Sequence, residues 1–167
     1  CLYPVTPKVK IGEDAAFTYP CLLAAESLAY VDGCLYHYRN NVQSMTAAFD
    51  PHLTETIFIP LDILRTYFDT DKRALFAQYQ MYAAYLLQLW VRNQASLDCD
   101  LDRKGLRQSC ARVCQNQELR ALLASVPGAL PRQVAVAVRA VQQQKPGQLY
   151  LLIKAWNLYY KLRNGRA

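Results

Sequence analysis

The sequence predicts a mainly α-helical chain with one short β-hairpin near its N-terminus. Helical spacing of apolar residues recurs from Pro51 to the C-terminus, and an Asp-Gly pair sits between two short β-prone runs in the first third of the chain. With 53% hydrophobic and 19% charged residues, 167 residues suffice for a folded domain with its own core.

The first predicted element is a helix over residues 12–25. Apolar residues recur there at helical spacing, although Pro20 should kink or restart the helix because it lacks an N–H donor. Glu13 and Asp14 fall in the first turn, where carboxylates interact favourably with the unpaired N–H groups of a helix. Taken alone, this acidic pair is ordinary helix-start chemistry.

The next predicted element is a hairpin with strands near 28–31 and 34–38. Its two-residue loop is Asp32-Gly33, which favours a type I′ turn between two strands. A single hairpin is marginally stable in water, so it must pair with a larger sheet or pack on helices.

The rest of the chain is predicted to be helical. Capping residues mark several starts, with Asp71 before the longest helix, Asp100 or Asp102 before the next, and Pro131 at a first helical position. The apolar stripe of the longest helix, from Leu75 to Trp90, is expected to be core. The predicted helices span 54–69, 72–96, 102–115, 117–125, 131–144 and 147–163.

The number of cysteines alone does not decide whether they are free thiols or disulfides. Six cysteines are compatible with disulfides in a secreted protein, but most lie among apolar residues, where a free cysteine behaves as a small hydrophobe. We expect reduced thiols. Cys110 and Cys114 could share a helix face, yet with only His37 and His52 elsewhere a zinc site is not expected.

No targeting or membrane-spanning segment is predicted. No uncharged apolar run approaches the roughly 18–20 residues that span a bilayer, and the start lacks a signal-peptide pattern. The chain begins at Cys1 without a helix cap or a paired strand, which suggests a fragment of a longer protein.

One group of motifs is dense enough to suggest a family. Gly12-Glu13-Asp14, then Phe17, then "AYVDGCLYHYR" and finally Ser44-Met45-Thr46 follow one another within residues 10–46. Their order and spacing resemble the C-terminal end of the catalytic domain in family 2 glycosyltransferases of the bacterial cell-surface polysaccharide type.

The resemblance implies a GT-A α/β fold and sugar transfer with inversion from a nucleotide-sugar donor to a glycan or lipid-linked acceptor. Asp14 matches the family's general base, and a carboxylate suits that role because it can take the proton of an attacking hydroxyl. Glu13 would have a supporting role. Arg39 and Ser44 would bind substrate near the donor diphosphate, where a guanidinium can neutralise the leaving group.

What this sequence lacks is the family's donor half. No acidic metal-binding element or Gly-rich phosphate loop precedes Gly12, so the divalent metal (Mg²⁺ or Mn²⁺) of the family would be bound outside this chain. We expect the chain alone to be inactive. Residues 1–50 would be the end of a GT-A domain on its acceptor side, and residues 51–167 a helical subdomain.

Basic residues gather in the last third of the chain. After Glu118 there are eight Lys and Arg and no Asp or Glu, so this segment supplies the whole net charge of +6. The aromatic and basic stretch 148–167 suits a helix at an anionic membrane surface, as expected of a cytoplasmic, peripheral enzyme. A buried terminal helix with solvated lysines is the competing interpretation.

Two further interpretations stay open. The chain could be a helical module that binds an acidic partner, a membrane or nucleic acid, although the cations are spread over three helices without a recognition-helix signature. Alternatively, the apolar helix faces could mediate oligomerisation.

Overall fold

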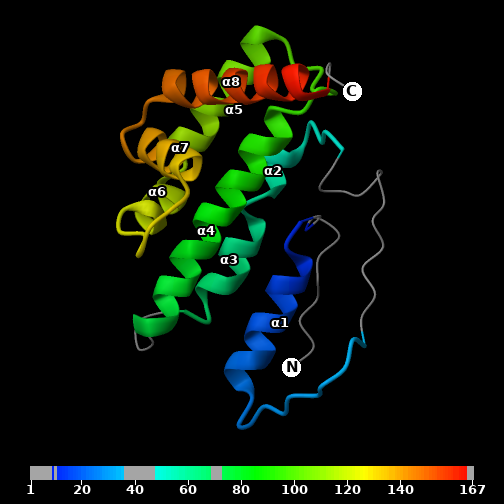
Figure 1. Ribbon diagram of the computed structural model, residues 1–167. Coiled ribbons are helices and arrows are strands. Elements are labelled where there is room, and N and C mark those ends of the chain that lie inside the picture. Colours follow the sequence, from blue (N-terminus) through cyan, green and yellow to red (C-terminus); the bar gives the residue numbers. More distant parts are fainter. Residues whose placement is uncertain (1–8, 10, 36–47, 69–72, 165–167) are drawn as a thin grey trace.

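The fold of the described residues is α-helical. A computed structural model of the protein describes residues 9, 11–35, 48–68 and 73–164, and within these ranges there is no β-strand. Figure 1 shows one long helix, α4, around which the others are arranged. The helices are α1 (Glu13–Ala24), α2 (Leu53–Thr56), α3 (Ile59–Arg65), α4 (Arg73–Gln94), α5 (Arg103–Gln115), α6 (Gln117–Leu123), α7 (Arg132–Gln142) and α8 (Pro146–Asn164).

Helix α4 supplies the centre of the hydrophobic core. Four of its side chains are fully buried, and two tyrosines are nearly so: Ala83, Leu86, Leu87 and Trp90, with Tyr79 and Tyr82. These residues recur three and four positions apart, which places them on one side of the helix. The predicted core stripe is confirmed except for Phe76, which is 40% exposed.

Helices α5 to α8 pack on one another and on α4. Helix α8 lies against α5 and α7, while α6 and α7 lie against α4. The carboxylate of Asp102 accepts a hydrogen bond from the Gly105 amide at 2.6 Å, and the Asn116 side chain accepts one from Leu119 at 2.9 Å. The predicted cap at Asp102 is therefore confirmed, and each cap satisfies an amide that the helix itself cannot pair.

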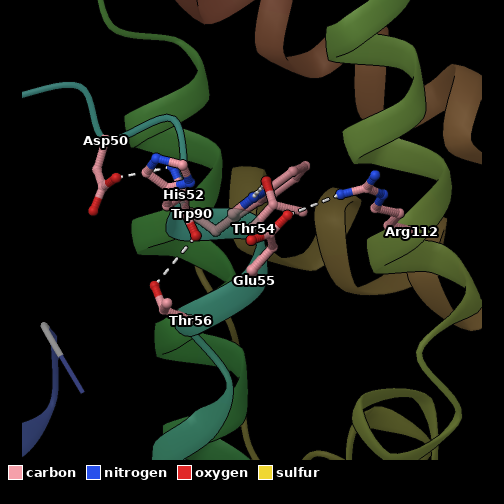
Figure 2. Close-up of polar contacts among 7 residues, drawn as sticks. All are labelled: Asp50, His52, Thr54, Glu55, Thr56, Trp90 and Arg112. Atoms are coloured by element: carbon pink, nitrogen blue, oxygen red, sulfur yellow. Dashed lines mark hydrogen bonds and ion pairs between the residues drawn. The ribbon is translucent and has the colours of Figure 1, made fainter. Parts of the chain in front are cut away.

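The predicted helix 54–69 is divided into two, and its first part ties α4 to α5. Figure 2 shows the Trp90 indole N–H donating to the Thr54 hydroxyl at 3.0 Å. The neighbouring Glu55 forms an ion pair with Arg112 of α5 at 3.2 Å. Since Trp90 is fully buried, an indole N–H without this partner would cost about 1–3 kcal/mol.

The predicted helix 12–25 is confirmed as α1, which lies beside α3 (Figure 1). Pro20 stands inside it and is buried, as is Ala16. Phe17 and Leu22 point away from that contact and are close to half exposed.

The predicted hairpin is wrong where the structure describes it. Residues 25–35 form no strand, and Leu28, Tyr30 and Leu35 are between 75% and 89% exposed. The Leu35 amide bonds to the Gly33 carbonyl at 3.0 Å, across two residues rather than across a strand pair. The physical reason is that no second sheet element is present among the described residues to bury these side chains. Residues 36–38, the end of the predicted second strand, lie outside the described ranges.

A pair of carboxylates meets between α3 and α6. Arg65 donates to Glu118 at 2.9 Å, and Asp62, one turn earlier on α3, lies close enough to Glu118 for a side-chain hydrogen bond. Partial burial raises the pKa of Asp62 to about 6, and the hydrogen bond and the charge of Glu118 contribute in the same direction.

This arrangement predicts a pH dependence of stability. Because the folded state holds a proton on Asp62 up to about pH 6, whereas an unfolded aspartate releases it near pH 3.8, stability should fall as the pH rises through this window. We expect Asp62→Asn to raise the melting temperature at pH 7.5 by a few degrees and to change it less at pH 4.5. Thermal unfolding at both pH values checks this, with Asp98→Asn in an exposed loop as the control. Equal shifts at the two pH values would contradict it.

Candidate functional site

The start of α1 is the candidate site, and glycine at position 12 determines its geometry. Gly12 has φ = 86° and ψ = 17°, the left-handed conformation that glycine adopts at little cost. Its carbonyl accepts the first helical hydrogen bond, from the Ala16 amide at 2.9 Å. The turn at Gly12 thus sets the direction of α1 and brings Glu13 and Asp14 to its first turn.

Tyr82 of α4 holds this turn in place. A Cβ atom at Gly12 would collide with the Tyr82 hydroxyl and would approach the Cγ atom of Pro60 on α3 to 3.2 Å. Only glycine therefore permits such close approach of the turn to α3 and α4. This contact joins the N-terminal segment of the protein to its central helix.

The Tyr82 hydroxyl is buried and has no hydrogen-bond partner among the described residues. Burial raises the pKa of Tyr82, and the nearby Asp14 carboxylate raises it further, so the phenol keeps its proton. A buried donor without a partner is uncommon in proteins. The Tyr82 hydroxyl lies against the turn that precedes Asp14, so an unpaired buried donor is present next to the start of α1.

Two tyrosine rings lie beside Tyr82. The Tyr19 ring of α1 meets it edge-on at 5.8 Å between centroids, and the Tyr85 ring lies 6.3 Å away in a stacked orientation. Tyr19 is 37% and Tyr85 52% exposed. Partly exposed aromatic side chains therefore lie beside Tyr82, the residue that contacts the turn at Gly12.

The two acidic residues differ in exposure. Asp14 is exposed, and one of its oxygens accepts a hydrogen bond from the Ala15 amide at 2.8 Å. Glu13 is partly buried. An exposed carboxylate at a helix N-terminus can accept a proton from a hydroxyl group that approaches it, which is the chemical capacity expected of Asp14.

The other predicted site residues are not placed. Arg39 and Ser44 both lie outside the described residues. Sequence reasoning identified Glu13 and Asp14 but treated Tyr82 only as core. The available signal was the hydroxyl itself, since a tyrosine at a core position needs a polar partner that phenylalanine does not.

Neither the cysteines nor the carboxylates form a metal site in the described part of the chain. No three His, Cys, Asp or Glu side chains come together there, and Cys21, Cys34, Cys99, Cys110 and Cys114 are free. Burial raises the pKa of Cys110 to about 12 and that of Cys114 to about 11, so both thiols stay protonated. The described residues therefore provide no ligand set for the divalent metal that the family resemblance implies.

Two surface hollows lie away from Asp14. One, of about 480 Å³, is formed by Gln117, Arg120 and Ala121 of α6 with Ala124 and Gln142. The other, of about 280 Å³, lies between the end of α4 and the end of α8. Neither includes a predicted site residue.

Comparisons with known proteins add no family assignment. No protein-family model matches the chain, and searches of curated proteins and of solved structures find no significant match. The glycosyltransferase resemblance stays a prediction.

The contact between Gly12 and Tyr82 can be tested by substitution. Gly12→Ala should cost the roughly 1–3 kcal/mol of a left-handed alanine and, in addition, the energy of displacing Tyr82. Gly128, with φ = 78° and open space around its Cβ position, is the matched control, because Gly128→Ala should cost the backbone part only. Urea unfolding measures both free energies.

A double-mutant cycle isolates the contact itself. In a Tyr82→Phe background the colliding hydroxyl is gone, so the extra cost of Gly12→Ala over Gly128→Ala should shrink, with a coupling energy of about 0.5–3 kcal/mol. Equal costs for the two glycine substitutions in both backgrounds would show that the turn does not rest on Tyr82.

Proposed function

We propose that this chain forms the acceptor side of an inverting glycosyltransferase, with Asp14 as the general base. The observation that carries the proposal is the position of Asp14: its exposed carboxylate stands in the first turn of α1, which begins at the glycine turn packed against Tyr82. The sequence motif around it supplies the reaction class, and the helical packing supplies a rigid support for the carboxylate.

The chemistry asked of Asp14 is a single proton transfer. As an acceptor hydroxyl oxygen attacks the anomeric carbon of the donor sugar, its proton passes to the Asp14 carboxylate. The bond between that carbon and the diphosphate breaks on the opposite side, and a nucleoside diphosphate leaves. A positioned base typically accelerates such a step about 10²–10⁴-fold.

The surroundings of Asp14 support an acceptor that is a sugar. Tyr19 and Tyr85 are partly exposed and lie beside Tyr82, which contacts the turn at Gly12, and the apolar face of a pyranose ring can pack on such aromatic side chains while its hydroxyls remain solvated. Glu13, partly buried in the same turn, has a supporting role in holding this segment. Arg39 and Ser44 would act on the donor diphosphate.

The donor nucleotide and the divalent metal would be bound by a separate nucleotide-binding half. The 167-residue chain by itself should accordingly release no nucleoside diphosphate. A role at the cytoplasmic face of the membrane, in cell-surface polysaccharide synthesis, accompanies this proposal.

The test uses the full reading frame that contains these residues. Release of nucleoside diphosphate from a panel of nucleotide sugars, with divalent metal and acceptor extract, is compared between wild type and Asp14→Asn. We expect kcat to fall about 10²–10⁴-fold while donor binding and folding persist. Asp32→Asn, which removes an exposed carboxylate outside the helix, is the control and should keep full activity.

The alternatives make different predictions in the same experiment. Normal turnover by Asp14→Asn would show that Asp14 is not the general base. Its role would then be limited to the start of α1, and another residue would act as the base. An absence of both donor binding and turnover with every nucleotide sugar would favour the helical interaction module over the transferase.

A further inference from the structure

The outer side of α8 carries an apolar stripe that no described part of the protein covers. Leu151, Leu158 and Leu162 are 66%, 57% and 58% exposed, and Ala155 is exposed between them. Their spacings of four, three and four residues place all four on one side of the helix. Leu149 and Ile153, by contrast, are fully buried against the core.

This stripe has a basic border. Lys154 and Lys161 are exposed one helical heptad apart, immediately beside the leucines, and Arg163 follows in the last turn. The 19 residues of α8 contain no Asp or Glu. Apolar residues flanked by lysines along a surface helix are typical of a helix that lies in a membrane interface.

Helix α5 extends the positive charge of this border. The Arg107 guanidinium lies 5.2 Å from the centre of the Tyr150 ring of α8, and α5 and α8 pack side by side (Figure 1). The inner side of α8 is buried, so its outer side and the adjacent Arg107 of α5 form one exposed surface. We call this surface the α8 face; it consists of Arg107, Leu151, Lys154, Ala155, Leu158, Lys161 and Leu162.

Acidic residues lie near the α8 face as well. The Asn157 side chain donates to the carbonyls of Ala95 and Ser96 at 3.2 and 3.1 Å, which brings the segment after α4 next to α8. That segment carries Asp98 and Asp100, both exposed. The attraction of the α8 face for anions thus depends on its net charge, to which these two aspartates contribute negatively.

We propose that the α8 face docks the protein on an anionic membrane surface, with the leucine stripe in the interface and the lysines at the headgroups. The positive charge of the α8 face favours an anionic membrane over a second copy of the chain as its partner. Two α8 helices joined through their stripes would bring lysines together without any carboxylate of α8 to pair with them. None of the described helices is long and apolar enough to cross a bilayer. The proposal does not rest on the glycosyltransferase assignment.

The test is co-sedimentation with vesicles of phosphatidylcholine, with or without about one-third phosphatidylglycerol. Wild type should bind only the anionic vesicles, and binding should weaken with salt. Lys154→Gln with Lys161→Gln should weaken it about 30-fold, since each surface cation contributes about 1 kcal/mol. Asp98→Asn with Asp100→Asn should strengthen it, because these two exposed carboxylates lie beside the α8 face.

Matched variants separate the α8 face from the rest of the molecule. Leu151→Gln with Leu158→Gln should abolish most binding, whereas Leu28→Gln with Val31→Gln, which changes the same number of exposed apolar residues elsewhere, should not. Arg132→Gln with Arg139→Gln is the control for net charge, because both residues are exposed on α7. Circular dichroism confirms that each variant is folded.

Three outcomes would overturn the proposal. One is an absence of binding to anionic vesicles at low salt. Another is equal loss of binding in the α7 charge control, which would indicate net charge rather than the α8 face. The third is a dimer in light scattering that Leu151→Gln with Leu158→Gln dissociates, which would assign the stripe to a second copy of the chain.

Discussion

The burial of α4 is the constraint on which the rest of this structure depends. Trp90, Leu86 and Leu87 are fully enclosed by helices that come before and after α4 in the chain. Enclosing an indole also demands a partner for its N–H, and the four-residue helix α2 provides one through Thr54 (Figure 2). The short α2 segment is therefore held both by this hydrogen bond and by the burial of Leu53 and Ile57 in the core.

The same helix connects the two surfaces to which we assign functions. At Tyr82, α4 supports the turn that presents Asp14, and further along, its C-terminal end and the segment after it contact α8 through Asn157. Between these two points α4 is continuous and mostly buried. A substrate-binding surface at α1 and a docking surface at α8 would thus be held at a fixed separation.

Much of the helical architecture could be predicted from the sequence, because caps and apolar spacing are local signals. Asp102 caps α5 as expected, and the stripe on α4 is core with the exception of Phe76. The turn residues Asp32-Gly33 predicted a hairpin that the described residues do not contain. A turn signal alone is insufficient, since strands need partners that lie elsewhere in the sequence. Similarly, the approach of Tyr82 to Gly12 joins residues seventy positions apart, which no local pattern encodes. Asp14 could be proposed from the sequence because its motif is local, whereas the packing of Tyr19 and Tyr85 beside Tyr82 could not.

Hydrogen exchange across residues 11–35 would test the central claim most directly, namely that the acidic motif begins a helix docked on α3 and α4 and is followed by an unpaired segment. The account predicts slow exchange at the amides of α1 from Phe17 to Ala24, Pro20 excepted, and fast exchange from Ser27 to Leu35, where no strand pairing is present. Protection of alternate amides between Leu28 and Leu35 would reveal a paired strand there. That result would contradict the helical account and return this segment to the sheet that the family resemblance implies.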